Sequence, residues 1–126
     1  MKKIEIVLSS IFAISLVVFS VIWGTIFAQD TLAPTIPLVP SNLALSGTST
    51  TTSISLSWAD NSNNEDKFNV ERKLTTATDW TGAWSYQVTT ANTTSYTNTG
   101  LTAGTAYDYR VQACLSGTGC SGWAYL

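Results

Sequence analysis

The sequence contains no histidine, only two cysteines and few charged residues, which make up 11% of its 126 residues. The lack of histidine excludes nucleophilic sites built on a serine–histidine or cysteine–histidine pair, together with most zinc sites. The carboxylates Asp60, Glu65 and Asp66 share one short polar stretch, whereas glycoside hydrolysis needs two carboxylates held apart across a cleft. We therefore expect no enzyme active site and no cofactor.

The same stretch, residues 60–66 (DNSNNED), contains no glycine, although calcium-binding loops place their ligands around a glycine turn. Asn, Asp and Ser are ordinary turn-forming residues because their side chains hydrogen-bond to nearby backbone. We expect a solvated turn here and no metal site.

Basic residues are scarce as well. Beyond residue 28 they are Lys67, Arg72, Lys73 and Arg110, against seven acidic residues, so this part of the chain carries a net charge of −3. Surfaces that bind nucleic acid need clustered lysine and arginine. We expect no nucleic-acid partner.

Residues 1–28 differ from the rest in composition. Lys2 and Lys3 precede 23 uncharged residues from Ile6 to Ala28. This is longer than the roughly 7–15 apolar residues of a cleavable signal, and a helix needs about 20 residues to span a bilayer. Cleavage after Ala28 is the alternative, although Ile26 is larger than the residue usually found three positions back. The segment is a signal peptide or a transmembrane anchor, and because lysines mark the cytoplasmic side, both place the remainder outside the cell.

Residues 29–40 contain Pro34, Pro37 and Pro40. Prolines at this spacing hold a chain extended and semi-rigid. This segment is expected to be a linker that leads into a single domain at residues 41–126.

From residue 41 onward apolar and polar residues alternate, which is typical of strands with one buried face. In residues 53–58 (SISLSW), Ile54, Leu56 and Trp58 share one face. The same alternation recurs in three other groups: Phe68 and Val70; Trp84, Tyr86 and Val88; and Tyr107, Tyr109, Val111 and Ala113. All of these are expected in the core of an all-β sandwich, because turn-rich stretches separate them. Cys114 is expected on the outward face.

Five segments carry a family resemblance: the proline-flanked stretch 37–40, SNLALS directly after it (41–46), SISLSWADNSNNEDKFNVERK (53–73), TTSYTNTGLTAGTAYDYRVQAC (93–114) and GCSGW (119–123). In order and spacing they resemble the fibronectin type III domain of bacterial secreted and surface proteins. The resemblance implies a seven-stranded antiparallel Greek-key sandwich with a short last strand. It also implies that Trp58 is buried, and that Leu101 and Tyr107 form a corner in which the tyrosine hydroxyl bonds to backbone.

Cys114 and Cys120 stand at the ends of the final hairpin loop of this arrangement. A cross-strand pair beside a short loop lies within disulfide range, so we expect a structural disulfide formed in an oxidising compartment. A free thiol pair, a metal site and a redox centre are the alternatives, and a metal site would need more ligands than two cysteines. Glu71 and Arg110, on outward faces of strands that the family pairs, are expected to form a surface ion pair.

Trp80 breaks the alternation, because it lies in the polar stretch TDWTG. It is a candidate ligand contact, and the alternative is that it folds over the sheet edge. We expect a non-catalytic extracellular interaction or spacer module, secreted or tethered through residues 6–28, with an unknown extracellular protein or polysaccharide as partner. The second hypothesis is a carbohydrate-binding accessory domain of a secreted glycan-degrading system, which an exposed coplanar pair of aromatic rings would favour.

Overall fold

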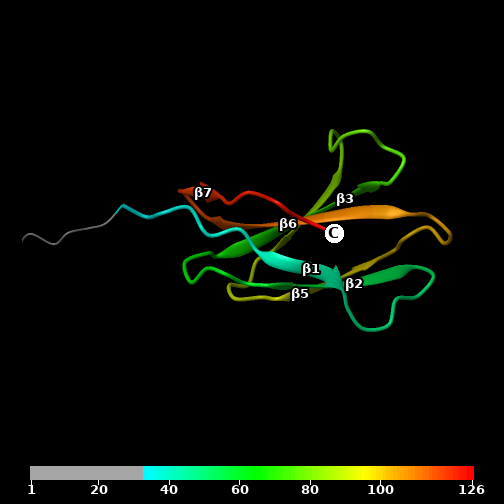
Figure 1. Ribbon diagram of the computed structural model, residues 1–126, viewed down its shortest axis with the longest axis horizontal. Coiled ribbons are helices and arrows are strands. Elements are labelled where there is room, and N and C mark those ends of the chain that lie inside the picture. Colours follow the sequence, from blue (N-terminus) through cyan, green and yellow to red (C-terminus); the bar gives the residue numbers. More distant parts are fainter. Residues whose placement is uncertain (1–32) are drawn as a thin grey trace, which may run out of the picture. The chain divides into compact units, whose positions relative to one another are not determined.

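The computed structural model describes residues 33–126 and contains eight strands there (Figure 1). They are β1 (Ser41–Leu45), β2 (Ser53–Ala59), β3 (Lys67–Leu74), β4 (Trp84–Val88), β5 (Ser95–Thr99), β6 (Tyr107–Leu115), β7 (Gly119–Cys120) and β8 (Ala124–Tyr125). The expected N-terminal apolar helix lies outside the described residues. Within residues 33–126 no helix is long and apolar enough to cross a membrane.

The strands form two antiparallel sheets that pack as a sandwich (Figure 1). Sheet A has the order β1-β2-β5, and sheet B has the order β4-β3-β6, with β7 and β8 both paired to β6. The expectation of seven strands was wrong by one, because the closing strand is split in two. At the break, the Ser121 hydroxyl accepts a hydrogen bond from the Ala113 N–H at 3.0 Å and donates one to the Gly122 carbonyl at 2.8 Å. A side chain thus replaces part of the backbone ladder.

The core lies between the inner faces of the two sheets. Its buried members are Leu43, Leu56, Trp58, Phe68, Val70, Tyr109, Val111 and Ala113. The alternation expected for β2, β3 and β6 is confirmed, since the buried members of each strand are two residues apart: Leu56 and Trp58, Phe68 and Val70, and Tyr109, Val111 and Ala113. Each fully buried large side chain stabilises the fold by about 1.5–3 kcal/mol relative to exposure.

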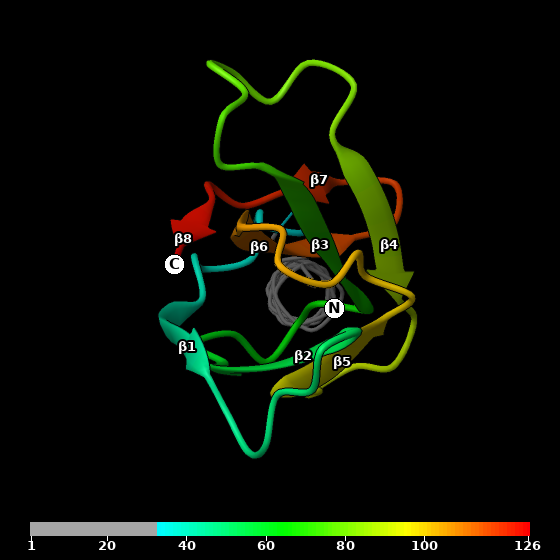
Figure 2. The same cartoon turned by 90° about the vertical axis from the view of Figure 1, so that its right-hand side faces the viewer.

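The expected burial of Trp84 and Tyr86 was wrong. Their side chains are 37% and 46% exposed, although they lie on the same face of sheet B as Val70, which pairs with Tyr86. The reason is their position, because β4 is the last strand of sheet B and β5 is the last strand of sheet A (Figure 2). Beyond an edge strand there is no further strand whose side chains could cover its inner face. The side of the sandwich at which β4 and β5 lie is therefore open to solvent.

The segment expected to be a linker contacts the domain through its second half. Asn64 donates to the Thr35 carbonyl at 2.8 Å, Asn61 donates to the Val39 carbonyl at 2.8 Å, and the Leu38 N–H donates to Ser62 at 2.9 Å. Residues 35–39 therefore run along the polar loop between β2 and β3.

Candidate functional site

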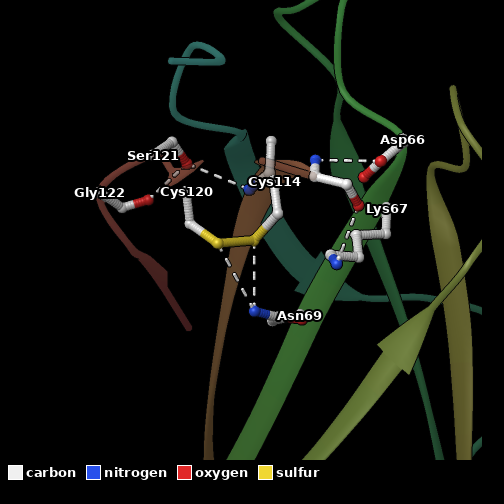
Figure 3. Close-up of a disulfide and its surroundings, with 9 residues drawn as sticks. Asp66, Lys67, Asn69, Cys114, Cys120, Ser121 and Gly122 are labelled. Atoms are coloured by element: carbon white, nitrogen blue, oxygen red, sulfur yellow. Dashed lines mark hydrogen bonds between the residues drawn. A yellow bond between two sulfur atoms is a disulfide. The ribbon is translucent and has the colours of Figure 1, made fainter. Parts of the chain in front are cut away.

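Cys114 and Cys120 form a disulfide that joins β6 to β7, with the sulfurs 2.06 Å apart (Figure 3). Cys114 lies on the outward face, opposite Lys67, but its side chain is only 1% exposed. It is covered there by its partner and by Asn69, whose amide donates to the Cys114 sulfur at 3.2 Å (Figure 3). The bridge closes the last hairpin and forms part of the structural framework.

The structure describes all three residues that were expected as the core signature. Trp58 and Leu101 are buried, at 4% and 6% exposure. The Thr102 N–H donates to the Tyr107 hydroxyl at 3.3 Å, and this hydrogen bond lowers the pKa of the Tyr107 phenol. The Thr102–Tyr107 hydrogen bond holds the corner before β6.

Trp80 is half-buried and packs on the outer face of sheet B. Its ring centroid lies 4.2 Å from the Arg110 guanidinium carbon, and the Trp123 ring lies 4.1 Å from the same atom on β6. Arg110 also forms the expected ion pair with Glu71, at 2.6 Å. The outer face of sheet B is therefore not wholly polar, since two tryptophan rings cover its arginine. The role of Trp80 as a ligand contact stays a prediction, and this packing favours the alternative, a cover on the sheet.

The carboxylates of the 60–66 loop accept hydrogen bonds from backbone amides. Glu65 accepts from the Asn92 N–H at 2.8 Å, Asp66 accepts from the Ser116 N–H at 3.0 Å, and Asp60 accepts from the N–H two residues further along at 3.0 Å. In the part of the chain that the structure describes, no group of three or more acidic or cysteine side chains is placed to hold a metal ion. Through Glu65 and Asp66, the loop between β2 and β3 is hydrogen-bonded to the loops that contain Asn92 and Ser116.

A group of stacked aromatic rings at the open side of the sandwich, two of them exposed and one half-buried, was not foreseen. It consists of Trp84, Tyr86 and Tyr96, which we call the open-edge cluster. The planes of the Trp84 and Tyr86 rings lie within 7° of each other, with centroids 6.0 Å apart, and Tyr86 stacks on Tyr96 with centroids 4.8 Å apart. Exposed aromatic surface of this kind marks binding surfaces more often than single exposed apolar residues do.

A groove of about 320 Å³ adjoins this cluster, at the base of the β3–β4 connection. Figure 2 shows this connection projecting from sheet B on the side away from sheet A. Among the residues that line the groove are Arg72, Lys73, Asp79, Thr81, Trp84 and Tyr107.

Arg72 lies at the wall of the groove between two rings. Its guanidinium carbon is 4.7 Å from the Trp84 ring centroid and 5.1 Å from that of Tyr107. Its Nη1 donates to the Oδ1 of Asn98, a fully buried residue of β5, at 2.5 Å. One sequence signal pointed to this site: Arg72 follows Phe68 and Val70 in the apolar phase of β3, where a charged residue is unexpected.

Comparison with known proteins gives the family. A search of curated proteins found no match. Among solved structures, the crystal structure of the chicken CNTN1 FN1-FN3 domains matches with a TM-score of 0.60 and 18% identity, and covers 73% of this chain. This chain spans only 30% of the length of that one. A structure described as a myokine matches with a TM-score of 0.54 and 19% identity, over 71% of this chain and 95% of its own. The family model for the fibronectin type III domain matches residues 38–123, and the chain belongs to that family.

Proposed function

We propose that this domain is a non-catalytic interaction module that acts outside the cell, and that its binding surface is the open-edge cluster. Fibronectin type III domains are generally interaction or spacer modules rather than enzymes. One observation carries the proposal for this chain: Trp84 and Tyr86 are 37% and 46% exposed on a face where the strand pattern is apolar. Large rings left in water at the edge of a fold offer binding energy to a partner that covers them.

The extracellular location is supported by two features at opposite ends of the chain. Residues 1–28 have the composition of an export signal or a membrane anchor, and residues 29–40 then connect them to the domain. The Cys114–Cys120 disulfide is typical of oxidising compartments. The resemblance of the motifs to bacterial secreted and surface proteins supports a bacterial module of this type.

Fractionation of cells that express the full chain tests the location. If residues 6–28 form an anchor, the protein pellets with membranes and resists carbonate extraction. If they are a cleaved signal, the protein is recovered in the medium with Gln29 as its first residue. Recovery of the full chain in the cytosol with both thiols free would contradict export altogether.

The second candidate function is carbohydrate binding, and the parallel rings of Trp84 and Tyr86 favour it. Aromatic side chains provide apolar faces on which the C–H groups of a sugar ring pack, while polar groups beside them bind the hydroxyls. Asp79 and Thr81 on the rim of the adjoining groove are such polar groups.

Binding measurements on a variant of the open-edge cluster test both candidates. Tyr86→Ala removes an exposed ring that has no part in the buried core. We expect it to weaken binding by about 1–3 kcal/mol in a glycan array or a pull-down with extracellular material, with little change in melting temperature. Tyr125→Ala, which removes a ring that is 58% exposed outside the cluster, is the matched control and should bind as wild type. If Tyr86→Ala binds as tightly as wild type, the open-edge cluster is not the binding surface.

A further inference from the structure

We infer that the groove beside Trp84 binds the carboxylate of an acidic saccharide, a chain that contains uronic acid, and that Arg72 holds this carboxylate. The inference rests on the second candidate function above and names its ligand class and the residue that selects it.

Arg72 has more hydrogen-bond donors than it uses within the described part of the fold. Trp84 lies on β4 and Tyr107 on β6, the two neighbours of β3, and their ring centroids are 4.7 and 5.1 Å from the guanidinium carbon. A guanidinium has five N–H donors, all of which lie in its plane. Nη1 is directed at Asn98, towards the interior, and Arg72 also lines the groove. The donors of this plane that do not bond to Asn98 are therefore placed to meet a ligand in the groove.

The charge of Arg72 is not matched by a carboxylate. The ion pairs between side chains within residues 33–126 are Lys73–Asp108, at 2.7 Å, and Arg110–Glu71, at 2.6 Å. Lys73, the other cation of the groove, is therefore neutralised. Within the described residues the side-chain hydrogen bond of Arg72 goes to a neutral amide and the residue makes no ion pair. A half-buried arginine in this state is complementary to an anion, and its planar fork matches the two oxygens of a carboxylate.

The surroundings of Arg72 favour a sugar acid over an acidic peptide. The groove continues into the exposed ring of Trp84, which lies parallel to that of Tyr86. Its volume of about 320 Å³ is at the small end of ligand sites and suits one sugar ring. A uronic acid residue seated in the groove presents its carboxylate to Arg72, while the next residues of the chain lie along the rings. Thr81 and Asp79 at the rim are partners for hydroxyl groups.

Calorimetric titration with a matched pair of probes tests this assignment. One probe is an oligogalacturonate, and the other is the same oligosaccharide with its carboxylates methyl-esterified. We expect wild type to bind the acid about tenfold or more tightly than the ester, because a charge-assisted contact to arginine is lost in the ester. Raising the salt concentration should reduce the difference in affinity between the acid and the ester, because salt screens the charge of the carboxylate.

Two variants and a control locate the effect. Arg72→Gln should reduce binding of the acid about tenfold or more and leave binding of the ester nearly unchanged. Lys67→Gln removes an equal charge from the same strand, outside the groove, and should bind both probes as wild type. If Arg72→Gln fails to fold, Asp79→Asn carries the test, because it removes an exposed negative charge at the rim and keeps the oxygen that accepts from the Thr81 N–H. It should strengthen binding of the acid about two- to fivefold through reduced repulsion, and leave the ester unchanged.

The outcomes separate this inference from the function on which it rests. Equal affinities for the acid and the ester would overturn the role of Arg72 and leave carbohydrate binding standing. Binding of neither probe, together with a partner captured through Tyr86, would overturn the saccharide and leave the interaction module. Displacement of the oligogalacturonate by a short polyglutamate of equal affinity would overturn the preference for a sugar.

Discussion

Trp80 packs against Arg110, with the guanidinium carbon 4.2 Å from the centroid of the indole ring, although the two residues lie 30 positions apart in the sequence. The contact folds part of the β3–β4 connection onto the outer face of sheet B. It gives a tryptophan in a polar loop a structural role, because the ring covers the guanidinium of Arg110, which also forms an ion pair with Glu71.

We expect Trp80→Ala to lower the free energy of unfolding by about 1–2 kcal/mol, since a partly desolvated cation–π contact and its apolar packing are both lost. Urea unfolding monitored by circular dichroism measures this. Thr78→Ala, an exposed residue of the same loop, is the control and should unfold as wild type. A Trp80→Ala protein of unchanged stability that fails to bind its ligand would instead make Trp80 a ligand contact.

Trp58 is the largest side chain of the core cluster, and its ring centroid lies 5.4 Å from that of Phe68 on the facing sheet. Trp58→Ala should cost about 3–5 kcal/mol, as large-to-small changes in cores do, and leave little folded protein. Trp58→Phe should cost much less, because the buried indole Nε1 has no hydrogen-bond partner to lose. Equal melting temperatures for wild type and Trp58→Ala would place this residue outside the core.

The Cys114–Cys120 disulfide should stabilise the domain by about 2 kcal/mol, the amount expected for closing so short a loop in the unfolded chain. Intact mass spectrometry of the exported protein should show a mass lower by two hydrogens than after reduction. The Cys114→Ser/Cys120→Ser double variant should unfold at a lower temperature than wild type, and reductant should not lower it further. Quantitative thiol labelling of unreduced protein would show that the bridge does not form.

Stability should fall as the pH drops below about 4, where aspartate carboxylates begin to protonate. Hydrogen bonds from Lys73 and then Thr75 lower the pKa of Asp108. A carboxylate whose pKa is lowered by folding contributes stability above its unfolded pKa, and this is lost as the pH falls through the folded value. Burial raises the pKa of Asp60, which acts in the opposite direction.

The variant Asp108→Asn tests the source of this acid sensitivity. It should be less stable than wild type at neutral pH and should lose less stability on acidification, as measured by thermal unfolding at a series of pH values. A slope equal to that of wild type would assign the sensitivity to other carboxylates, such as Asp66, whose pKa is lowered by hydrogen bonds from Ser116.

Much of the fold could be read from the sequence because period-2 alternation is a local property. Leu56, Phe68 and Val111 are all fully buried, as their strands predicted. The split of the closing strand was not readable, since it depends on the hydroxyl of Ser121 meeting the backbone of Ala113 on the neighbouring strand.

The candidate site was less accessible to this reasoning. The prediction that Trp84 and Tyr86 point to the inner face of the sheet was correct, but the prediction that they are buried was wrong. The face of the sheet to which a side chain points follows from its position along the strand. Its exposure depends on which strand lies at the edge of the sheet.

The sequence by itself determined that the domain is an all-β sandwich with Trp58 in its core, and that its cysteines are close enough to pair. Only the tertiary structure decided that β4 and β5 form an open side, that Trp80 lies on Arg110, and that Arg72 stands between two rings beside a groove. These relationships join residues that are distant in sequence. They therefore depend on how the sheets pair and how loops fold back, which local alternation does not encode.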